Sequence, residues 1–284
     1  MANYLNFEEV FKTRNPQYEF LLSRMRCAMG VDEVKFSDIN TINLRRFKDY
    51  MEGEVSNNSL RTYMAVLKAA INEMVSDGLI SNAKCVSVLK AKAEPQQNVS
   101  LTDEEIKKLE NYYECLLKTS GNQIEKGVLT LFLIEIFTGA RGVDVENFTL
   151  DNINENKLTY VSKKTHTLTV LPAHHKLKLL IKNMPNREFS RMTKNRTIKR
   201  IAKLCGINQL VNIYYHGRQR KMPKYEFVAF HTARRSFVSN LIERGVPISA
   251  VSKLAGHKNI NMTQRYFVTQ DIQLDDKAMA FFND

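Results

Sequence analysis

An interruption of the helical pattern near residue 95 divides the chain into two parts that fold separately. Before it, apolar residues recur at three- and four-residue steps, most clearly in the segment that begins at Ser59. Residues 91–100 then read AKAEPQQNVS, where one proline and two glutamines break the periodicity. Because 284 residues are too many for one small core, we predict two domains joined by a linker. The predicted ranges are a helical domain at residues 1–93, a linker at 94–101 and a second domain at 102–284.

The second domain changes its hydrophobic period part-way along, which indicates a mixed fold. It opens with Thr102-Asp103-Glu104-Glu105, a capping box, and residues 128–137 are apolar enough for a buried helix. Between residues 156 and 172 apolar and polar residues alternate, which predicts a β-hairpin that turns at about residues 163–166. Helical spacing returns at residues 193–205 and 247–255. The predicted fold class is therefore mainly α with a small antiparallel β-sheet, in which a helical N-terminal domain precedes a mixed α/β domain.

The positive charge is concentrated in one stretch of the second domain. Residues 1–100 hold 13 Lys and Arg against 12 Asp and Glu, whereas residues 156–225 hold 17 Lys and Arg against the single acid Glu188. So many positive charges repel one another unless a polyanion binds to them, which favours nucleic acid as the partner. A solvated basic face is the alternative. A membrane is disfavoured, because the longest apolar run is too short to span a bilayer and the basic stretch has no aromatic-rich amphipathic helix.

The cysteines and the N-terminal residues narrow the class of protein further. The four cysteines are scattered and form no Cys-x-x-Cys pair, so neither a metal site nor a disulfide framework is expected. This pattern fits a cytoplasmic protein, and the first residues, MANYLNFEEV, lack the basic flank and apolar run of a signal peptide. We expect no metal and no other cofactor.

Five short motifs, far apart in the sequence, carry the groups needed to attack a phosphodiester without a metal. The transition state of such an attack gathers charge on the phosphate oxygens, so fixed cations aimed at those oxygens help most. Arginine suits this role because it stays charged and donates in a planar fork. His231 and Arg234, three residues apart, are expected to share one face at the start of a helix. The motifs are Thr138-Gly139-Ala140-Arg141, Lys163-Lys164-Thr165, His231-Thr232-Ala233-Arg234, Gly256-His257 and Tyr266.

In this order and spacing the motifs resemble those of the tyrosine recombinase family, which includes phage integrases and Xer-type recombinases, over nearly the whole chain. The resemblance implies an N-terminal SAM-like core-binding domain and a catalytic domain that clamp duplex DNA between them. It also implies that Arg141 and Arg234 hold the phosphate oxygens and that Asp144, three residues after Arg141, braces the site. The sequence departs from the family's pattern at Arg235, where a histidine is more usual, and at Ala255 before Gly-His.

The resemblance assigns the remaining catalytic roles to four side chains. Tyr266 attacks the phosphorus and becomes a 3′-phosphotyrosine, while His231 accepts the phenol proton and His257 makes a hydrogen bond to a non-bridging oxygen. A lysine on the hairpin turn gives a proton to the departing 5′ oxygen, and Lys164 fits this position better than Lys163. The phosphotyrosyl bond keeps the energy of the phosphodiester, so rejoining needs no ATP.

The expected partner is double-stranded DNA, and the expected activity is site-specific recombination through a Holliday junction, as for an integrase of a mobile genetic element. The resemblance implies a monomer or weak oligomer in solution and a tetramer on paired sites. It also allows an accessory DNA-bending protein as a further partner. Two alternatives are a type IB topoisomerase-like enzyme, which uses a similar residue set as a monomer, and a catalytically silent DNA-binding protein of the same fold. The basic residues expected to contact DNA are Arg45, Arg46, Arg61, Lys68, Lys163, Lys194, Arg196, Lys199 and Arg200.

Overall fold

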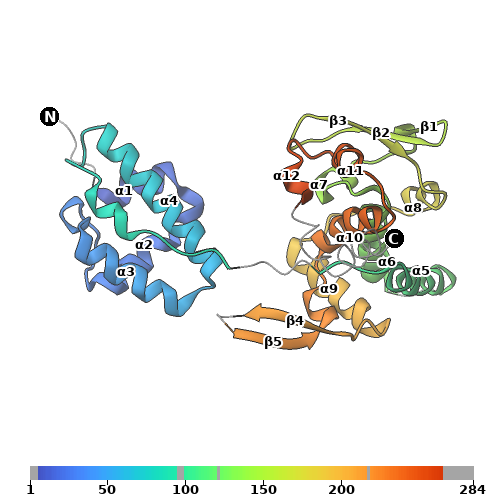
Figure 1. The fold of residues 1–284 in the computed structure, drawn as a ribbon, viewed down its shortest axis with the longest axis horizontal. Coiled ribbons are helices and arrows are strands. Elements are labelled where there is room, and N and C mark those ends of the chain that lie inside the picture. Colours follow the sequence, from blue (N-terminus) through green and yellow to red (C-terminus); the bar gives the residue numbers. More distant parts are fainter. Residues whose placement is uncertain (1–5, 95–98, 120–121, 216–217, 265–284) are drawn as a thin grey trace, which may run out of the picture. The chain divides into compact units, whose positions relative to one another are not determined.

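A computed structural model describes residues 6–94, 99–119, 122–215 and 218–264, and Figure 1 shows its ribbon. By their internal contacts the residues form two compact units, residues 1–96 with 213–220 and residues 97–212 with 221–284. The first unit is helical apart from 213–220, and the second combines helices with a small antiparallel sheet. The predicted fold class is therefore confirmed.

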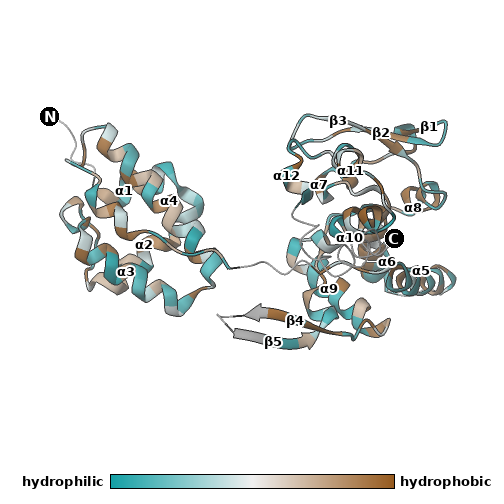
Figure 2. Cartoon of the chain, viewed as in Figure 1, coloured by the Kyte–Doolittle hydropathy of each residue, from teal (hydrophilic) through white to brown (hydrophobic). Residues whose placement is uncertain are grey.

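Four α-helices and three short 3-10 turns make up the helical part of the first unit. Asn40 and Ser56 begin the two longer helices, because each side chain accepts a hydrogen bond from a backbone N–H of the first turn. The apolar face of every helix turns towards one core, in which Phe11, Phe47 and Leu67 are completely buried. Figure 2 shows the resulting alternation of hydrophobic and hydrophilic residues along the helices. The elements are α1 (Phe7–Arg14), η1 (Pro16–Tyr18), α2 (Phe20–Met29), η2 (Phe36–Asp38), α3 (Thr41–Glu54), α4 (Asn57–Ser76) and η3 (Lys84–Val88).

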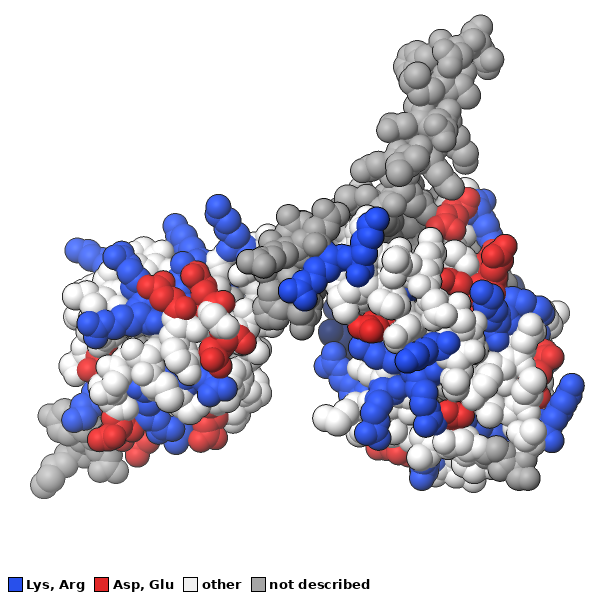
Figure 3. Space-filling model, turned by 90° about the horizontal axis from the view of Figure 1, so that it is seen from below, with Lys and Arg blue, Asp and Glu red and all other residues white. Residues whose placement is uncertain are grey.

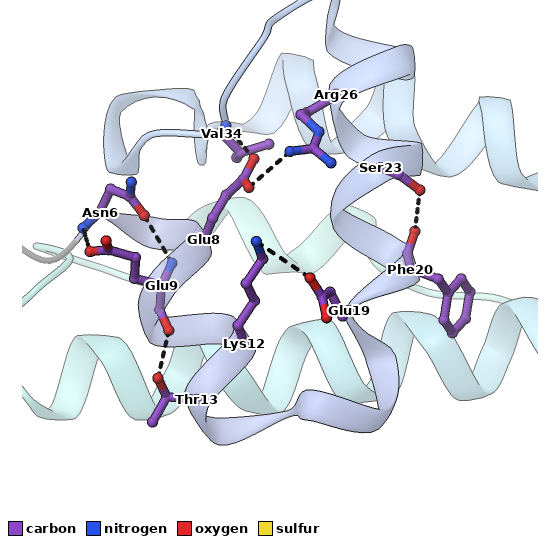
Figure 4. A network of polar contacts seen from close by, with 10 residues as sticks. All are labelled: Asn6, Glu8, Glu9, Lys12, Thr13, Glu19, Phe20, Ser23, Arg26 and Val34. Atoms are coloured by element: carbon purple, nitrogen blue, oxygen red, sulfur yellow. Dashed lines mark hydrogen bonds and ion pairs between the residues drawn. The ribbon is translucent and has the colours of Figure 1, made fainter.

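A buried carboxylate ties the first helix to its neighbours (Figure 4). Glu8 of α1 accepts a hydrogen bond of 2.9 Å from the backbone N–H of Val34 and one of 3.2 Å from Nη1 of Arg26. In the same first turn, Asn6 and Glu9 form a reciprocal capping box at the start of the helix. These contacts satisfy the buried charge and fix α1 against α2 and the loop at Val34.

The second unit is built around α6, a helix that is apolar on every side. Most of its residues are buried, and it contacts α5, α8, α9 and α10. The capping box predicted at Thr102 is present, and α6 covers the predicted buried segment. No helix in the part of the chain that the structure describes is long and apolar enough to cross a membrane. The elements are α5 (Asp103–Lys118), α6 (Gln123–Thr138), α7 (Gly142–Val145), η4 (Leu150–Asn152), α8 (Leu177–Lys182), α9 (Arg191–Leu204), η5 (Lys224–Phe227), α10 (Phe230–Glu243), α11 (Ile248–Leu254) and α12 (Asn261–Gln264).

Two antiparallel sheets complete the part of the fold that the structure describes. The predicted hairpin is confirmed as β2 (Lys157–Val161) paired with β3 (Leu168–Pro172), and β1 (Ile153–Asn154) extends it to the order β1-β2-β3. The buried pairs Leu158–Leu171 and Tyr160–Thr169 face the core, as the alternation of the sequence requires. A second hairpin, β4 (Leu210–Tyr215) with β5 (Arg218–Pro223), was not predicted. Its signal is present in the β-branched residues of LVNIYY and in the His-Gly dipeptide before RQRKMP.

The start of the second unit is fastened to α10. The backbone N–H of Leu101 donates to Oγ of Ser236 at 2.8 Å, and that hydroxyl in turn donates to the carbonyl of Thr232. Asp103, the first residue of α5, accepts from Asn240 at 3.3 Å and from Arg244 at 2.8 Å. The end of the predicted linker and the first turn of α5 are thereby joined to one face of α10.

Candidate functional site

The site begins with the sharp turn at the end of α6. The N–H of Gly139 donates to the carbonyl of Glu135 at 2.8 Å, and its φ of +61° is the left-handed conformation of a glycine helix end. A Cβ at this position would collide with the ring of Phe237, so no other residue fits without movement. The carbonyl of Gly139 accepts a hydrogen bond of 2.6 Å from Nη1 of Arg234. Gly139 therefore ends α6, lets Phe237 of α10 pack closely, and accepts a hydrogen bond from the candidate residue Arg234.

Arg141 follows this turn and is linked to the β2–β3 hairpin through two buried residues. Its Nη1 donates to Oγ of Ser162 at 2.9 Å, and Ser162 donates to Oδ2 of Asp144 at 3.0 Å. The other carboxylate oxygen of Asp144 accepts from the backbone N–H of Lys163 at 2.8 Å. Asp144 thus fixes the end of β2 and, through Ser162, the guanidinium of Arg141. Sequence reasoning found Asp144 but missed Ser162, because only the fold brings the hydroxyl between the two charges.

Lys164 lies next to this anchored residue, in the turn between β2 and β3. The turn is closed by hydrogen bonds from the N–H of Ser162 to the carbonyl of Thr167 and from the N–H of His166 to the carbonyl of Ser162. The side chains of Lys163 and Lys164 are both exposed, so each can reach a ligand above the turn. The hairpin thus presents Lys164 where the sequence motif predicted a turn lysine.

The helix start predicted for His231 and Arg234 is present as the first turn of α10. Asn195 of α9 accepts a hydrogen bond of 3.0 Å from the N–H of Phe230, and Thr232 accepts one of 3.0 Å from the N–H of Ala229. Arg234 is only 2% exposed, whereas His231, one turn earlier, keeps an exposed side chain. The capping residue Asn195 is another member of the site that the sequence did not reveal.

His257 comes from the turn after α11. Gly256 has a φ of +62°, and a Cβ there would lie 2.9 Å from Oγ1 of Thr169 on β3, so α11 approaches the sheet closely. The Nδ1 of His257 and Oγ1 of Thr263 are 2.8 Å apart. This contact orients the imidazole and joins the turn to α12.

Both histidines are neutral near neutral pH. Partial burial of the His231 ring, together with Arg235, Arg234, Arg141 and Arg191, lowers its pKa to about 4, although the residue as a whole is exposed. Burial, Arg234, Arg141 and His231 lower the pKa of His257 to about 4 as well. A neutral imidazole can accept a proton from a nucleophile or donate one ring N–H to an oxygen. Arg141 and Arg234 act on both imidazoles, and His231 acts on His257, so these four predicted residues lie within electrostatic reach of one another.

The remaining predictions divide between exposed cations and cations held in ion pairs. Tyr266 lies outside the described residues, the last of which is Gln264. Lys194 pairs with Glu146 and its side chain is 14% exposed, and Arg200 pairs with the buried Glu125. Both of these side chains have structural partners. Figure 3 shows lysine and arginine side chains spread over the visible face of both units. The exposed candidates are Arg45, Arg46, Arg61, Lys68, Lys163, Arg196, Lys199 and Arg200, the last of which is exposed although it is paired with Glu125.

Two arginines and two neutral histidines that influence one another, on a unit that combines helices with a small antiparallel sheet, match the candidate site expected of the tyrosine recombinase family. The family model described as the phage integrase family matches residues 70–271, and that of the phage integrase SAM-like domain matches residues 7–92. The chain belongs to the phage integrase family. Within the residues that the structure describes, no group of three or more His, Cys, Asp and Glu side chains is arranged to hold a metal.

Known proteins support this assignment along the length of the chain. The tyrosine recombinase XerC of Caldanaerobacter subterraneus subsp. tengcongensis is 24% identical over 307 residues, which cover 96% of this chain and 84% of the relative. The XerH site-specific recombinase bound to palindromic difH substrate has a TM-score of 0.66 at 17% identity, over 98% of this chain and 84% of that one. A lambda integrase dimer bound to a COC′ core site also has a TM-score of 0.66, at 18% identity over 92% of both chains. At these identities the structural likeness shows the fold.

Proposed function

We propose that this protein is a site-specific DNA recombinase that cleaves and rejoins strands through a 3′-phosphotyrosyl bond on Tyr266. The observation that carries the proposal is the gathering of Arg141, Arg234, His231 and His257 from three separate parts of the chain. The bond between His257 and Thr263 brings the described chain to this cluster, and Tyr266 follows Thr263 by only three residues in sequence. The nucleophile of the family therefore comes directly after a segment that is held at the site.

In the proposed reaction the two arginines receive the scissile phosphate. Each guanidinium is already oriented by a fixed acceptor, Ser162 for Arg141 and the carbonyl of Gly139 for Arg234. Their charge then meets the charge that develops on the non-bridging oxygens, with little rearrangement at the moment of reaction. The removal of one such preorganised donor costs roughly a hundred- to a thousandfold in rate.

Proton transfer is divided between the histidines and the hairpin. His231 is neutral and exposed, so it can take the phenol proton as Tyr266 attacks the phosphorus. The bond from phosphorus to the 5′ oxygen breaks, and Lys164 gives that oxygen its proton. His257, oriented by the contact of its Nδ1 with Oγ1 of Thr263, is assigned a hydrogen bond to a phosphate oxygen. A free 5′ hydroxyl from a second duplex reverses these steps and joins the strands.

The proposed substrate is double-stranded DNA, which binds against the exposed cations of both units. The structures of XerH and lambda integrase that resemble this chain are complexes with DNA sites. We propose that two pairs of protomers assemble on paired sites, exchange strands through a Holliday junction in the cytoplasm, and serve a mobile genetic element. A topoisomerase-like enzyme would act on one duplex as a monomer.

Covalent trapping tests the function. Purified wild type and Tyr266→Phe are mixed with nicked duplexes that cover the DNA flanking the gene, in the presence of a chelator. We expect an adduct that survives SDS, maps to Tyr266 by mass spectrometry and is lost in the phenylalanine variant. Tyr50→Phe, at a half-buried tyrosine of α3, is the matched control and should form the adduct as wild type does.

Three outcomes separate the functions. An adduct that goes on to exchange strands between two duplexes supports the recombinase. An adduct that only relaxes supercoiled circles, with one protomer on each duplex, replaces the recombinase by a topoisomerase-like enzyme. Binding without an adduct on any flanking duplex contradicts cleavage and leaves a DNA-binding protein.

A further inference from the structure

A buried serine just after β2 makes hydrogen bonds with both its side chain and its main chain. Ser162 is 1% exposed. Its hydroxyl accepts a hydrogen bond of 2.9 Å from Nη1 of Arg141 and donates one of 3.0 Å to Oδ2 of Asp144. Its main-chain N–H donates to the carbonyl of Thr167, and its main-chain carbonyl accepts from the N–H of His166. The side chain thus bonds to two charged groups, while the main chain closes the β2–β3 turn.

The direction of these hydrogen bonds decides what the hydroxyl can do. A serine hydroxyl has one proton, and here that proton is donated to Asp144. The oxygen of Ser162 therefore presents its lone pairs to Arg141, whose guanidinium can only donate. Asp144 is itself held, because it is 4% exposed and its Oδ1 accepts the backbone N–H of Lys163 at 2.8 Å. The hydrogen bonds therefore run in one direction, from the guanidinium through the hydroxyl to a fixed carboxylate.

A fixed acceptor matters for a side chain as flexible as that of Arg141. An arginine that is not held has many rotamers, and that freedom would have to be lost when a phosphate binds. The bond at Nη1 restricts the planar group before any ligand arrives. A guanidinium has further N–H groups in the same plane with which it can meet two phosphate oxygens. The hydroxyl of Ser162 thus sets the plane in which these donors point.

We propose that Ser162 is a positioning residue whose side chain serves Arg141, while its main chain separately serves the turn that presents Lys164. Loss of the hydroxyl leaves the main-chain bonds to Thr167 and His166 possible, so the two roles can be separated by substitution. Without the hydroxyl, the guanidinium no longer meets the non-bridging oxygens in a fixed orientation. The effect on catalysis rests on the proposed recombinase function, whereas the coupling between Ser162 and Arg141 does not.

Single-turnover cleavage of a nicked duplex at saturating protein tests the effect on the reaction. Ser162→Ala should slow formation of the Tyr266 adduct at least about tenfold, and by less than Arg141→Ala does, because the arginine is misplaced rather than absent. Ser239→Ala removes the hydroxyl of another buried serine, on α10, and should cleave at the wild-type rate. Equal rates for Ser162→Ala and wild type would overturn the proposal.

A duplex with sulfur in place of the scissile 5′ oxygen separates the arginine from the lysine turn. Its phosphorus–sulfur bond breaks to release a thiolate, which needs no proton from Lys164, because a thiol is far more acidic than an alcohol. With this duplex Lys164→Ala should cleave within about threefold of wild type. Ser162→Ala should remain at least about tenfold slower than wild type, since the non-bridging oxygens still need Arg141. If sulfur restores Ser162→Ala to the wild-type rate, the serine acts through the lysine turn and the proposal is wrong.

A double-mutant cycle tests the coupling without any cleavage. Ser162→Ala and Arg141→Met are made singly and together, and the melting temperature of each is measured. We expect the double variant to lose clearly less than the sum of the two single losses, because either change alone removes the bond between Oγ and Nη1. Arg244→Met, whose partner is Asp103, should combine additively with Ser162→Ala. Additive losses for Ser162 and Arg141 would overturn the positioning role, and the cycle decides this even if wild type forms no adduct and the recombinase function fails.

Discussion

At the scale of single residues, the candidate site combines two positively charged arginines with two histidines that are neutral near neutral pH. Arg141 and Arg234 remain charged at any pH in which the protein is folded. His231 and His257 stand beside them and would gain a proton only at low pH, because burial and the arginines disfavour the imidazolium. The division fits a reaction in which the arginines bind an anion and the histidines handle protons.

The lowered pKa of His257 predicts a loss of stability in acid. The unfolded chain takes up a proton on this ring as the pH falls through about 6.5, whereas the folded protein does so only at about 4. The contribution of His257 is therefore complete above about pH 6.5 and is lost as the pH falls towards 4. We expect the urea midpoint of wild type to fall between about pH 7.5 and about pH 5, and that of His257→Gln to fall less. His166→Gln, at an exposed turn position, should follow wild type. Parallel curves for wild type and His257→Gln would contradict the lowered pKa.

At the scale of elements, glycines at the ends of α6 and α11 bring the parts of the site together. Gly139 lets α10 approach the end of α6, and Gly256 lets the turn after α11 approach β3. Both have positive φ values and both would meet a neighbour if they carried a Cβ. The candidate site residues Arg141 and His257 follow these glycines by two residues and one residue, so the close approach of the elements sets where their side chains begin.

Gly139→Ala should be more harmful than the same change at another positive-φ glycine. The left-handed backbone alone costs an L-residue about 1–2 kcal/mol. At Gly139 the methyl group also has to displace the ring of Phe237, which adds about 1–3 kcal/mol. At Gly206, with φ +69° and no heavy atom within 4 Å of a Cβ, only the backbone cost applies. Free energies of unfolding from urea titrations give both values. Similar losses at the two glycines would show that the Phe237 contact is not tight.

The sequence predicted those parts of the site that rest on local patterns. The capping box at Thr102, the glycine end of α6 and the β2–β3 hairpin all depend on residues a few positions apart. Ser162 and Asn195 could not be found in this way. Ser162 meets Arg141 over 21 positions and Asn195 meets Phe230 over 35, so neither contact leaves a pattern within one segment. The β4–β5 hairpin was missed for a different reason, since its strand and turn signals are present but weak.

At the scale of the whole molecule, the positive charge lies on both units, but not every basic residue is free to meet DNA. Lys194 and Arg200 of α9 are engaged with Glu146 and Glu125, whereas Arg196 and Lys199 of the same helix are exposed. Within α9, Lys194 is therefore mostly covered, Arg200 is paired but its side chain is 57% exposed, and Arg196 and Lys199 face solvent. The division makes the contribution of α9 to DNA binding testable.

DNA affinity should fall steeply with salt, and α9 should account for a defined part of the slope. Each phosphate contact contributes about −0.9 to the slope of log K against log salt. If Arg196 and Lys199 each contact a phosphate, Arg196→Ala/Lys199→Ala should make the slope shallower by about 1.8. Fluorescence anisotropy over a salt series measures this, with Arg244→Ala as a control because Arg244 pairs with Asp103. A slope unchanged by the double variant would remove these two residues from the interface.

The fastening of Leu101 to Ser236 has a mechanical consequence. Ser236 lies two residues after Arg234 on α10, and its hydroxyl takes the backbone N–H of the residue that ends the predicted linker. Residue 101 is therefore anchored to the helix of Arg234 as well as to the start of α5. The second attachment, from Asp103 to Arg244, lies ten residues after Arg234, so the two attachments are separated along α10. A substitution that removes either hydrogen bond therefore loosens the start of the second unit from the helix that carries Arg234.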